Sequence, residues 1–581
     1  MKVRFSIVIL IVLLCSTTAV LAQDWPQWGL DPQHTGQSTV VGQSLDRNIV
    51  NIVYDNLVAE EMEAGEALVG EEALLAHFQA PLVDGNNVYM LRKTGTYSIS
   101  DYSTQSWSET KFSWSGGTLV EAWNFASDWK AMANAFDMWE PVFHPALANG
   151  SLYVPGAGGT IFRVDKGTGA GTRINPFNSI NDKTYTASPI SVAPNGDLYY
   201  TVIRLQGGPS FFSHDVVDSW LVKVTPSNVV TKVSFSAITP GAPAGNAQCL
   251  NAFIEGTDPL PWPPSPTAVP GSVTCGSQRA AVNAAPAIAP DGTVYVISRA
   301  HLISRWGYLI AVNPNLTFKW ISSLRERFND GCGVSVAQGG FFPPNGTPGG
   351  CRAGANLGVD PATNAPGGGR VLDDSSSSPV VAPDGSVFYG AYSRYNYAQG
   401  HLMKFSSSGA YLGTYGFGWD ITPGIYKHGA TYSVLTKENR YGEVGSYCNT
   451  EEFCPSDRDA NNPAYGEAYF ITQLNKNLNV EWMYRNTNTL SCHRNPDDSV
   501  TCVDDHPKSF EWCVNAWVID ANGTSYVNSE DGNLFAIDQG GILRKKIFQQ
   551  LALGAAYTPT SIGNDGKIYS QNAGHLFVAG F

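Results

Sequence analysis

The sequence carries little charge for its length. Only 15% of its 581 residues are charged, against roughly 25% in an average globular protein. Acidic residues outnumber basic ones, and the formal charge is −14. Nucleic acids and anionic lipids are held by basic patches, so we expect neither as a partner. No apolar run beyond the N-terminus is long enough to cross a bilayer, so we expect no transmembrane segment.

Several motifs that mark catalytic or cofactor sites are also missing. No two cysteines are adjacent, and neither a C-x-x-C-H haem-attachment motif nor a G-x-S-x-G nucleophile elbow occurs. Gly367-Gly368-Gly369 does not stand between an expected strand and an expected helix, as a phosphate-binding loop requires. The sequence therefore names no catalytic nucleophile.

The N-terminus has the pattern of a secretory signal. Lys2 and Arg4 precede an apolar run from Ile7 to Leu14, and Ala22 offers a small residue for cleavage. We expect residues 1–22 to be a signal peptide and the protein to be exported, to a periplasm or to the extracellular space.

The cysteines agree with export, which favours disulfide formation. Nine remain after residue 22, all of them beyond residue 248. Pairing neighbours along the chain gives four disulfides and leaves Cys513 over; the expected pairs are Cys249–Cys275, Cys332–Cys351, Cys448–Cys454 and Cys492–Cys502.

Turn-forming and aromatic residues are abundant, with 59 Gly, 35 Pro and 12% aromatics, a balance that favours short strands and tight turns. Residues 283–298 (NAAPAIAPDGTVYVIS) and 377–390 (SSPVVAPDGSVFYG) are near twins. Each has a short apolar run, a Pro-Asp-Gly turn and a second run with alternating apolar positions, which predicts a β-hairpin.

Weaker copies of this hairpin follow one another along the chain. They begin near Pro81, Pro145, Pro189, Pro286, Pro379, Ala516 and Pro559, and an eighth, near Thr431, is inferred from spacing. A further pair of strands follows most copies. Four antiparallel strands repeated about eight times predict a single all-β domain over residues 23–581, a β-propeller of four-stranded blades. Eight blades are favoured, and seven are the alternative.

The last copy has only three strands, so we expect an N-terminal strand to complete it and close the ring. Long insertions separate some copies, at about 205–280, 325–375 and 440–512. Residues 54–76 alone have a helical pattern. They are acidic, and we interpret them as a solvated face.

These repeats, with Asp24-Trp25-Pro26-Gln27-Trp28-Gly29 and His34-Thr35-Gly36 near the start, resemble the quinoprotein-dehydrogenase-like propellers. That family includes enzymes dependent on pyrroloquinoline quinone (PQQ) and the outer-membrane assembly factor BamB. The resemblance implies either a protein-binding propeller or a PQQ-dependent alcohol or sugar dehydrogenase with Ca²⁺. Because those enzymes typically hold PQQ beneath a disulfide of adjacent cysteines, which this chain lacks, no cofactor is expected; PQQ with Ca²⁺ is the alternative.

Four arginines follow the second strands of blades. They are Arg92, Arg204, Arg299 and Arg394. Converging on one face, they would hold a carboxylate, sulfate or phosphate, with Trp139 and Tyr395 available to stack on a sugar ring. The alternative is that each arginine pairs with a nearby acid.

The sequence also contains residues suited to two further chemistries. His144, His301 and His428 are acid–base candidates, and histidine beside an arginine-bound uronate would suit a polysaccharide lyase. Asp457, Asp459 and Asn461 alternate as calcium ligands do, although the closing glutamate is missing. We therefore expect a binding module for a protein partner or for an anionic small molecule or glycan; the alternatives are a PQQ-dependent oxidoreductase and a polysaccharide lyase.

Overall fold

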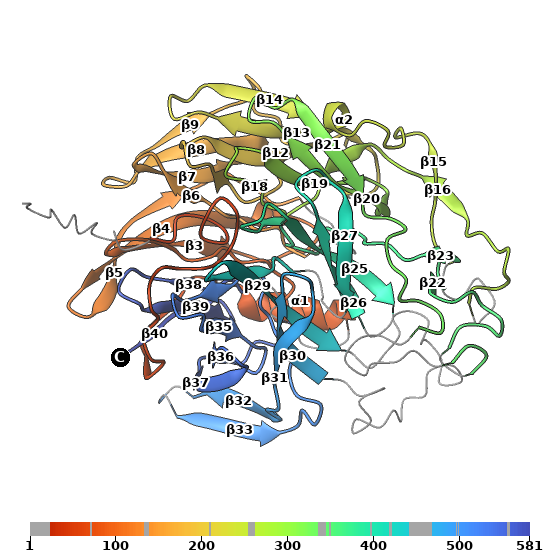
Figure 1. Cartoon of the computed structure of the whole chain (residues 1–581). Coiled ribbons are helices and arrows are strands. Elements are labelled where there is room, and N and C mark those ends of the chain that lie inside the picture. The colour runs from red at the N-terminus through yellow and green to blue at the C-terminus, as the bar shows by residue number, and fades with distance from the viewer. Residues whose placement is uncertain are drawn as a thin grey trace, which may run out of the picture.

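A computed structural model describes residues 24–69, 73–132, 139–207, 211–253, 262–334, 344–347, 350–395, 398–416, 421–440, 468–495, 497, 499–554 and 558–581. The fold is an eight-bladed β-propeller, with four-stranded antiparallel blades around a common centre (Figure 1). The expected fold class is confirmed, as is the eighth blade inferred near Thr431. The expected signal peptide lies outside the described residues.

The first four blades follow one another along the chain, and we number them in that order. Blade 1 is β2 (Leu82–Asp84), β3 (Asn87–Gly95), β4 (Gln105–Ser115) and β5 (Thr118–Ala126). Blade 2 is β6 (Ala146–Ala148), β7 (Ser151–Gly156), β8 (Thr160–Asp165) and β9 (Gly171–Ile174). Blade 3 is β10 (Thr184–Thr186) with β11 (Ser191–Val192), then β12 (Leu198–Leu205), β13 (Val216–Val224) and β14 (Val230–Ser234). Blade 4 is β17 (Gln278–Ala280) with β18 (Ala287–Ile288), then β19 (Val294–Ala300), β20 (Ile303–Val312) and β21 (Phe318–Ser323).

The other four blades complete the ring. Blade 5 is β24 (Val380–Val381), β25 (Val387–Tyr395), β26 (Ala398–Phe405) and β27 (Tyr411–Gly416). Blade 6 is β28 (Gly424–His428), β29 (Thr431–Arg440), β30 (Ala468–Asn475) and β31 (Val480–Arg485). Blade 7 is β34 (Val518–Ile519), β35 (Ser525–Asn528), β36 (Asn533–Asp538) and β37 (Ile542–Phe548). Blade 8 is β38 (Ser561–Ile562), β39 (Ile568–Asn572), β40 (His575–Gly580) and, from the N-terminus, β1 (Arg47–Val53).

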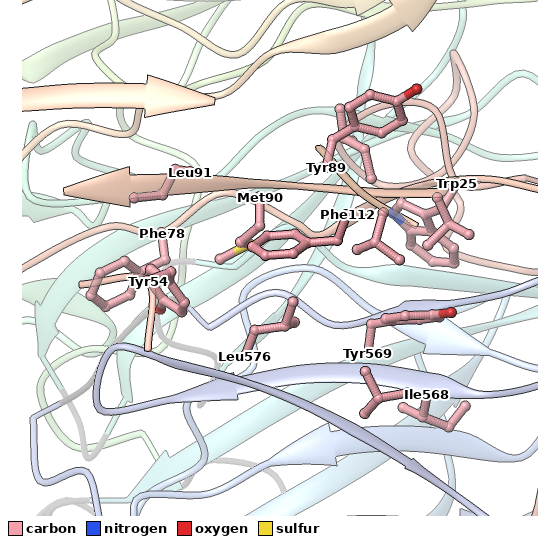
Figure 2. Close-up of a cluster of buried hydrophobic side chains, with 14 of the residues drawn as sticks. Trp25, Tyr54, Phe78, Tyr89, Met90, Leu91, Phe112, Ile568, Tyr569 and Leu576 are labelled. Atoms are coloured by element: carbon pink, nitrogen blue, oxygen red, sulfur yellow. The ribbon is translucent and has the colours of Figure 1, made fainter. Parts of the chain in front are cut away.

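Strand β1 closes the ring as the sequence predicts. It pairs antiparallel with β40, from Arg47 opposite Gly580 to Val53 opposite His575. The seam between blades 8 and 1 is sealed by buried apolar side chains, among them Tyr54, Phe112 and Tyr569 (Figure 2). Joining the first and last blades in this way removes two open sheet edges.

The N-terminal segment, residues 25–43, forms hydrogen bonds with each of the eight blades in ring order. Trp25 exchanges backbone hydrogen bonds with Val83 of blade 1 (2.9 and 3.0 Å). The contacts with the following blades join Pro26 to Leu147, Gln27 to Val192, Pro32 to Ile288, Gln33 to Val381, Thr35 to Ile425, Gly36 to Ile519 and Gln43 to Gly566. The motif at the start of the domain is therefore a strap that ties the innermost strands together.

The insertions carry three small hairpins of their own. They are β15 (Gln248–Leu250) with β16 (Ser272–Thr274), β22 (Val359–Asp360) with β23 (Ala365–Pro366), and β32 (Leu490–Arg494) with β33 (Val500–Asp504). Disulfides Cys249–Cys275, Cys332–Cys351 and Cys492–Cys502 are present as expected. Cys513 is free and buried, and the fourth expected pair, Cys448–Cys454, lies outside the described residues.

Two α-helices complete the described structure, α1 (Val58–Val69) and the single turn α2 (Phe235–Ile238). The prediction that residues 54–76 form a solvated acidic face is wrong for Glu61 of α1, which is buried against Lys93 of β3. No helix in the described ranges is long and apolar enough to cross a membrane.

Candidate functional site

Three of the four arginines that the sequence suggests as anion ligands have local partners. Arg92 forms an ion pair with Glu121 of its own blade (2.8 Å). Arg204 donates through Nε to Thr184 Oγ1 (2.8 Å), and its guanidinium lies over the Trp220 ring. Arg299 is buried and forms an ion pair with Asp373. Arg394 lies in β25, and its side chain and that of Tyr395 are outside the described residues.

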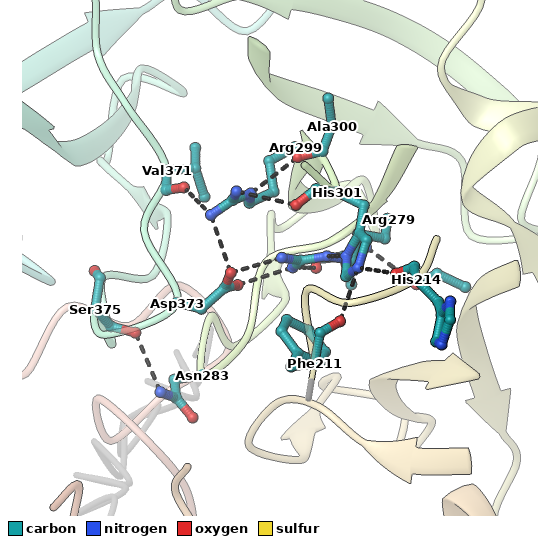
Figure 3. A network of polar contacts seen from close by, with 12 residues as sticks. Phe211, His214, Arg279, Asn283, Arg299, Ala300, His301, Val371, Asp373 and Ser375 are labelled. Atoms are coloured by element: carbon teal, nitrogen blue, oxygen red, sulfur yellow. Dashed lines mark hydrogen bonds and ion pairs between the residues drawn. The ribbon is translucent and has the colours of Figure 1, made fainter. Parts of the chain in front are cut away.

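Arg299 belongs to a buried ion network between blades 4 and 5 (Figure 3). Asp373 receives two hydrogen bonds from Arg279 (2.8 and 2.6 Å) and a third from Arg299 (2.9 Å). Burial opposes ionisation of this carboxyl, but the two guanidinium groups lower the pKa of Asp373 to about 2. Arg299 also donates to the carbonyl oxygens of Ala300, Val371 and His301. These arginines are therefore structural.

His301 is part of the same network. Its Nδ1 accepts from Arg279 Nε (2.8 Å), and its Nε2 donates to the carbonyl oxygens of Phe211 and His214 (2.9 Å each). Burial, then the neighbouring arginine charges, lower the pKa of His301 to about 3. The imidazole is therefore neutral at ordinary pH, and both ring nitrogens are engaged.

The other two candidate histidines lie elsewhere. His144 is buried against the edge of the Trp28 ring, its Nδ1 donates to the Pro145 carbonyl oxygen (2.8 Å), and burial lowers its pKa to about 3. His428, at the end of β28, stacks on Tyr426 and hydrogen-bonds Ser433. The three histidines thus occupy separate environments and form no joint acid–base group.

The clearest concave site lies where the first two large insertions meet beside blade 4. It is an open cleft of about 70 Å³. Hairpins β15–β16 and β22–β23, which help to form it, lie together at one side of the ring in Figure 1. Its lining is Leu250, Asn251, Pro270, Arg305, Arg325, Glu326, Asp360, Thr363, Ala365, Pro366, Gly368 and Gly369.

Two arginines in this cleft differ from those of the buried network. Arg305 makes one long contact, 3.3 Å, with Asp360, and Arg325 makes one contact, 3.1 Å, with Glu326. The Arg325 guanidinium also lies 3.5 Å from the centroid of the Trp306 ring, which fixes its plane. A guanidinium has five N–H donors, so within the described structure most of the donors of both arginines are available to a ligand.

Local backbone geometry shapes the cleft. A Cβ on Gly368 would lie 2.8 Å from the Arg325 Cα, so only glycine lets the two segments approach this closely. Glu326 itself has a φ of 56°, a strained conformation for a non-glycine residue. Gly368 and Gly369, from the glycine run that lacks the context of a phosphate-binding loop, thus form one wall of the cleft. Sequence reasoning missed Arg305 and Arg325 because neither follows a second strand.

A second charged cluster is buried beside blade 1. Lys93 forms ion pairs with Asp55 (2.9 Å), Glu140 (3.0 Å) and Glu61. Burial raises the pKa of Glu61 and of Glu140 despite the lysine. Trp139 is half-buried next to this cluster, with its ring 5.8 Å from that of His77. Glu61 lies in α1 and Lys93 lies in β3, so the ion pairs of this cluster hold α1 to blade 1.

Segments that lead into opposite blades meet at the centre of the ring. His77, which leads into blade 1, lies with Nε2 3.1 Å from the carbonyl oxygen of Asp374, which leads into blade 5. Blades 1 and 5 are opposite in an eight-bladed ring, so this contact spans the centre. Among the described residues, no three His, Cys, Asp or Glu side chains are arranged to hold a metal ion. The calcium candidates Asp457, Asp459 and Asn461 lie outside these residues.

Comparisons with known proteins bear on the fold alone. No family model matches the chain, and no curated protein matches it. The chain is similar to a europium-containing methanol dehydrogenase, with 10% identity over 94% of this chain and 89% of that one and a TM-score of 0.49. It is also similar to BamB from Moraxella catarrhalis (11% identity, 86% and 95% covered, TM-score 0.39). A third is the quinohemoprotein alcohol dehydrogenase from Comamonas testosteroni (11% identity, 96% and 80% covered, TM-score 0.45).

Proposed function

We propose that the protein is an exported binding propeller whose cleft beside blade 4 takes an anionic ligand, namely an acidic glycan or small molecule that carries carboxylate groups. The observation that carries this proposal is the state of Arg305 and Arg325, which face the cleft with most of their donors unused. The signal sequence and the three disulfides support export.

The chemistry of the cleft suits a carboxylate. Guanidinium groups bind carboxylates through two parallel hydrogen bonds, and stacking on Trp306 leaves the outer edge of Arg325 free to do so. Asp360 and Glu326 balance the two arginine charges at this site, so directed hydrogen bonds, and not net charge, would select a carboxylate. Glu326 and Asp360, at the same site, can accept hydrogen bonds from the hydroxyl groups of a glycan.

The proposal is tested by calorimetric titration with tri-galacturonate, with neutral maltotriose as the control ligand. Arg305→Gln and Arg325→Gln should each weaken binding by about tenfold or more, since a hydrogen bond to a charged group contributes about 1.5–3 kcal/mol. Arg92→Gln is the matched control, because Arg92 lies on blade 1, away from the cleft, and is paired with Glu121 of the same blade. This variant should bind as the parent does. Equal binding by all four proteins, or no binding by any, would refute the proposal.

The PQQ-dependent alternative has its own test. PQQ and Ca²⁺ are added to the purified protein, and the absorbance of the quinone and the reduction of a dye by alcohols are followed. Because contacts between His77 and Asp374 occupy the axis, we expect neither a spectral shift nor turnover. A shifted quinone spectrum with turnover would favour the oxidoreductase.

A further inference from the structure

A disulfide-linked hairpin forms an arm between blades 6 and 7. Strands β32 and β33 compose it, and they lie at the lower rim of the molecule in Figure 1, beyond β37. All five residues of β33 are exposed, including Val500 at 43% and Val503 at 55%. The arm is far from the cleft proposed above in sequence, and it shares no residue with it.

The register shows which backbone groups of β33 face outward. Cys492 stands opposite Cys502 with their Cα atoms 4.1 Å apart, the close spacing of a non-hydrogen-bonded antiparallel pair. Asn495 N–H donates to the Ser499 carbonyl oxygen (2.8 Å), and this hydrogen-bonded pair three positions away fits the same alternation. The N–H and C=O groups of Val500, Cys502 and Asp504 therefore point away from β32.

These outward groups form an open edge. In the part of the chain that the structure describes, β33 pairs with β32 alone, and Val500, Cys502 and Asp504 have no further backbone hydrogen bond. Natural edge strands are usually protected by lysine, proline or a bulge. The neighbouring outer strand β37 carries Arg544, Lys545 and Lys546, whereas β33 has no such residue.

The charge on the arm indicates what kind of strand it would accept. Asp497 before β33 and Asp504 at its end are both exposed. Between residues 490 and 505 the described arm carries Asp497, Asp504 and Asp505 against Arg494, so two arms would repel each other. An incoming strand with basic residues would instead be attracted.

We propose that β33 is a docking strand for an extended segment of a partner protein that carries basic residues at its ends and apolar residues between them. The segment pairs antiparallel with β33 and bonds to the outward groups of Val500, Cys502 and Asp504. Side chains alternate between the two faces of a strand, so Val500 and Asp504 lie on one face of β33 and Val503 lies on the other. Apolar side chains of the segment cover Val500 and Val503, one on each face, and basic side chains face Asp497 and Asp504. The disulfide between β32 and β33 keeps the arm formed before the partner arrives.

The probe is a fluorescent, N-acetylated peptide amide of sequence Lys-Val-Thr-Thr-Val-Ser-Thr-Lys, and binding is followed by anisotropy. Paired antiparallel, it places lysine opposite Asp504 and valine opposite Val503 and Val500. We expect saturable binding together with slower amide hydrogen exchange at residues 500–504. Val500→Pro removes one outward N–H at the first position of the strand, where proline is tolerated, and should weaken binding about fivefold or more. Val500→Thr keeps that N–H and should bind as the parent does. Asp504→Asn should weaken binding and reduce its salt dependence.

Three results would overturn the assignment. One is equal binding of the peptide by the parent, Val500→Pro and Asp504→Asn. Another is equal binding of the same peptide with glutamate in place of both lysines. The third is a parent protein that dimerises in sedimentation and becomes monomeric with Val500→Pro, because a second copy would then occupy the edge. Far-ultraviolet circular dichroism of each variant confirms that it is folded before binding is compared.

Discussion

Arg279 and Asp373 form a fully buried ion pair with two parallel hydrogen bonds, 2.8 and 2.6 Å long. The pair joins β17 of blade 4 to the segment that leads into blade 5. That same segment supplies the carbonyl oxygens of Asp374 and Ser375, which accept hydrogen bonds from His77 across the axis and from Asn283 of the adjacent blade 4. One ion pair thus holds both the blade interface and the segment that lies over the centre of the ring.

Asp373→Asn should therefore be strongly destabilising. The change leaves two buried guanidinium groups without a counter-charge, which costs about 3–5 kcal/mol in the free energy of unfolding. Urea unfolding at pH 7 measures this cost. Asp565→Asn, which removes an exposed carboxylate paired with Lys567, is the control and should cost less than about 1 kcal/mol. A loss for Asp373→Asn no larger than that of the control would contradict the assigned role.

Glu109 of β4 should make stability fall as pH rises. Burial raises the pKa of this carboxyl from 4.5 to about 8, despite a hydrogen bond from Gln79. The folded state then holds a proton that the unfolded state releases above pH 4.5, so its contribution is full below that pH and is lost as pH rises through about 8. Over this window the free energy of unfolding should fall by up to about 1.4 kcal/mol per pH unit.

Glu109→Gln isolates the effect, because glutamine has a similar shape and carries no ionisable group. The variant should match the parent in urea unfolding at pH 5 and exceed it at pH 8. An unchanged difference between the two proteins across this range would show that Glu109 does not titrate as described.

Gly36→Ala should disrupt the N-terminal segment that ties the blades together. Gly36 has a φ of 69°, and a Cβ there would lie 2.2 Å from the Trp517 carbonyl oxygen. Backbone strain and a clash with fixed backbone therefore combine, and we expect a loss of more than about 2 kcal/mol. Gly85→Ala is the matched control, since its φ is 59° but nothing lies within 4 Å of the added Cβ. Equal losses in thermal unfolding would mean that the strap is not tightly packed there.

Removing the Cys249–Cys275 disulfide should loosen one wall of the cleft. The bond holds β15 to β16 next to Leu250 and Asn251, and both of these residues line the site. Replacing both cysteines with alanine should lower stability by about 2–4 kcal/mol and weaken binding of tri-galacturonate. The same double replacement at Cys492 and Cys502 lies on the separate arm and should leave this binding unchanged. If the two double variants bind equally well, the first insertion does not shape the ligand site.

The sequence by itself determined the repeating architecture. A Pro-Asp-Gly turn and the alternation that follows it are local features, so each blade could be located from its own residues, as in the twins that became β18–β19 and β24–β25. The missing strand of the last copy likewise required a partner from the N-terminus, which β1 supplies. Spacing along the chain also yielded the three disulfides that are described.

Only the tertiary structure decided which charged residues are available to a ligand. Arg299 and Arg305 lie six positions apart on adjacent strands. Arg299 is paired with buried Asp373, whereas Arg305 faces the cleft. Asp373 is 74 residues from Arg299, and the sequence around neither residue predicts this ion pair. The expectation that Glu61 is solvated is wrong for the same reason, because its partner Lys93 is 32 residues away. Ion pairing depends on which segments the fold brings together and on how much water it excludes, and neither is encoded in local spacing.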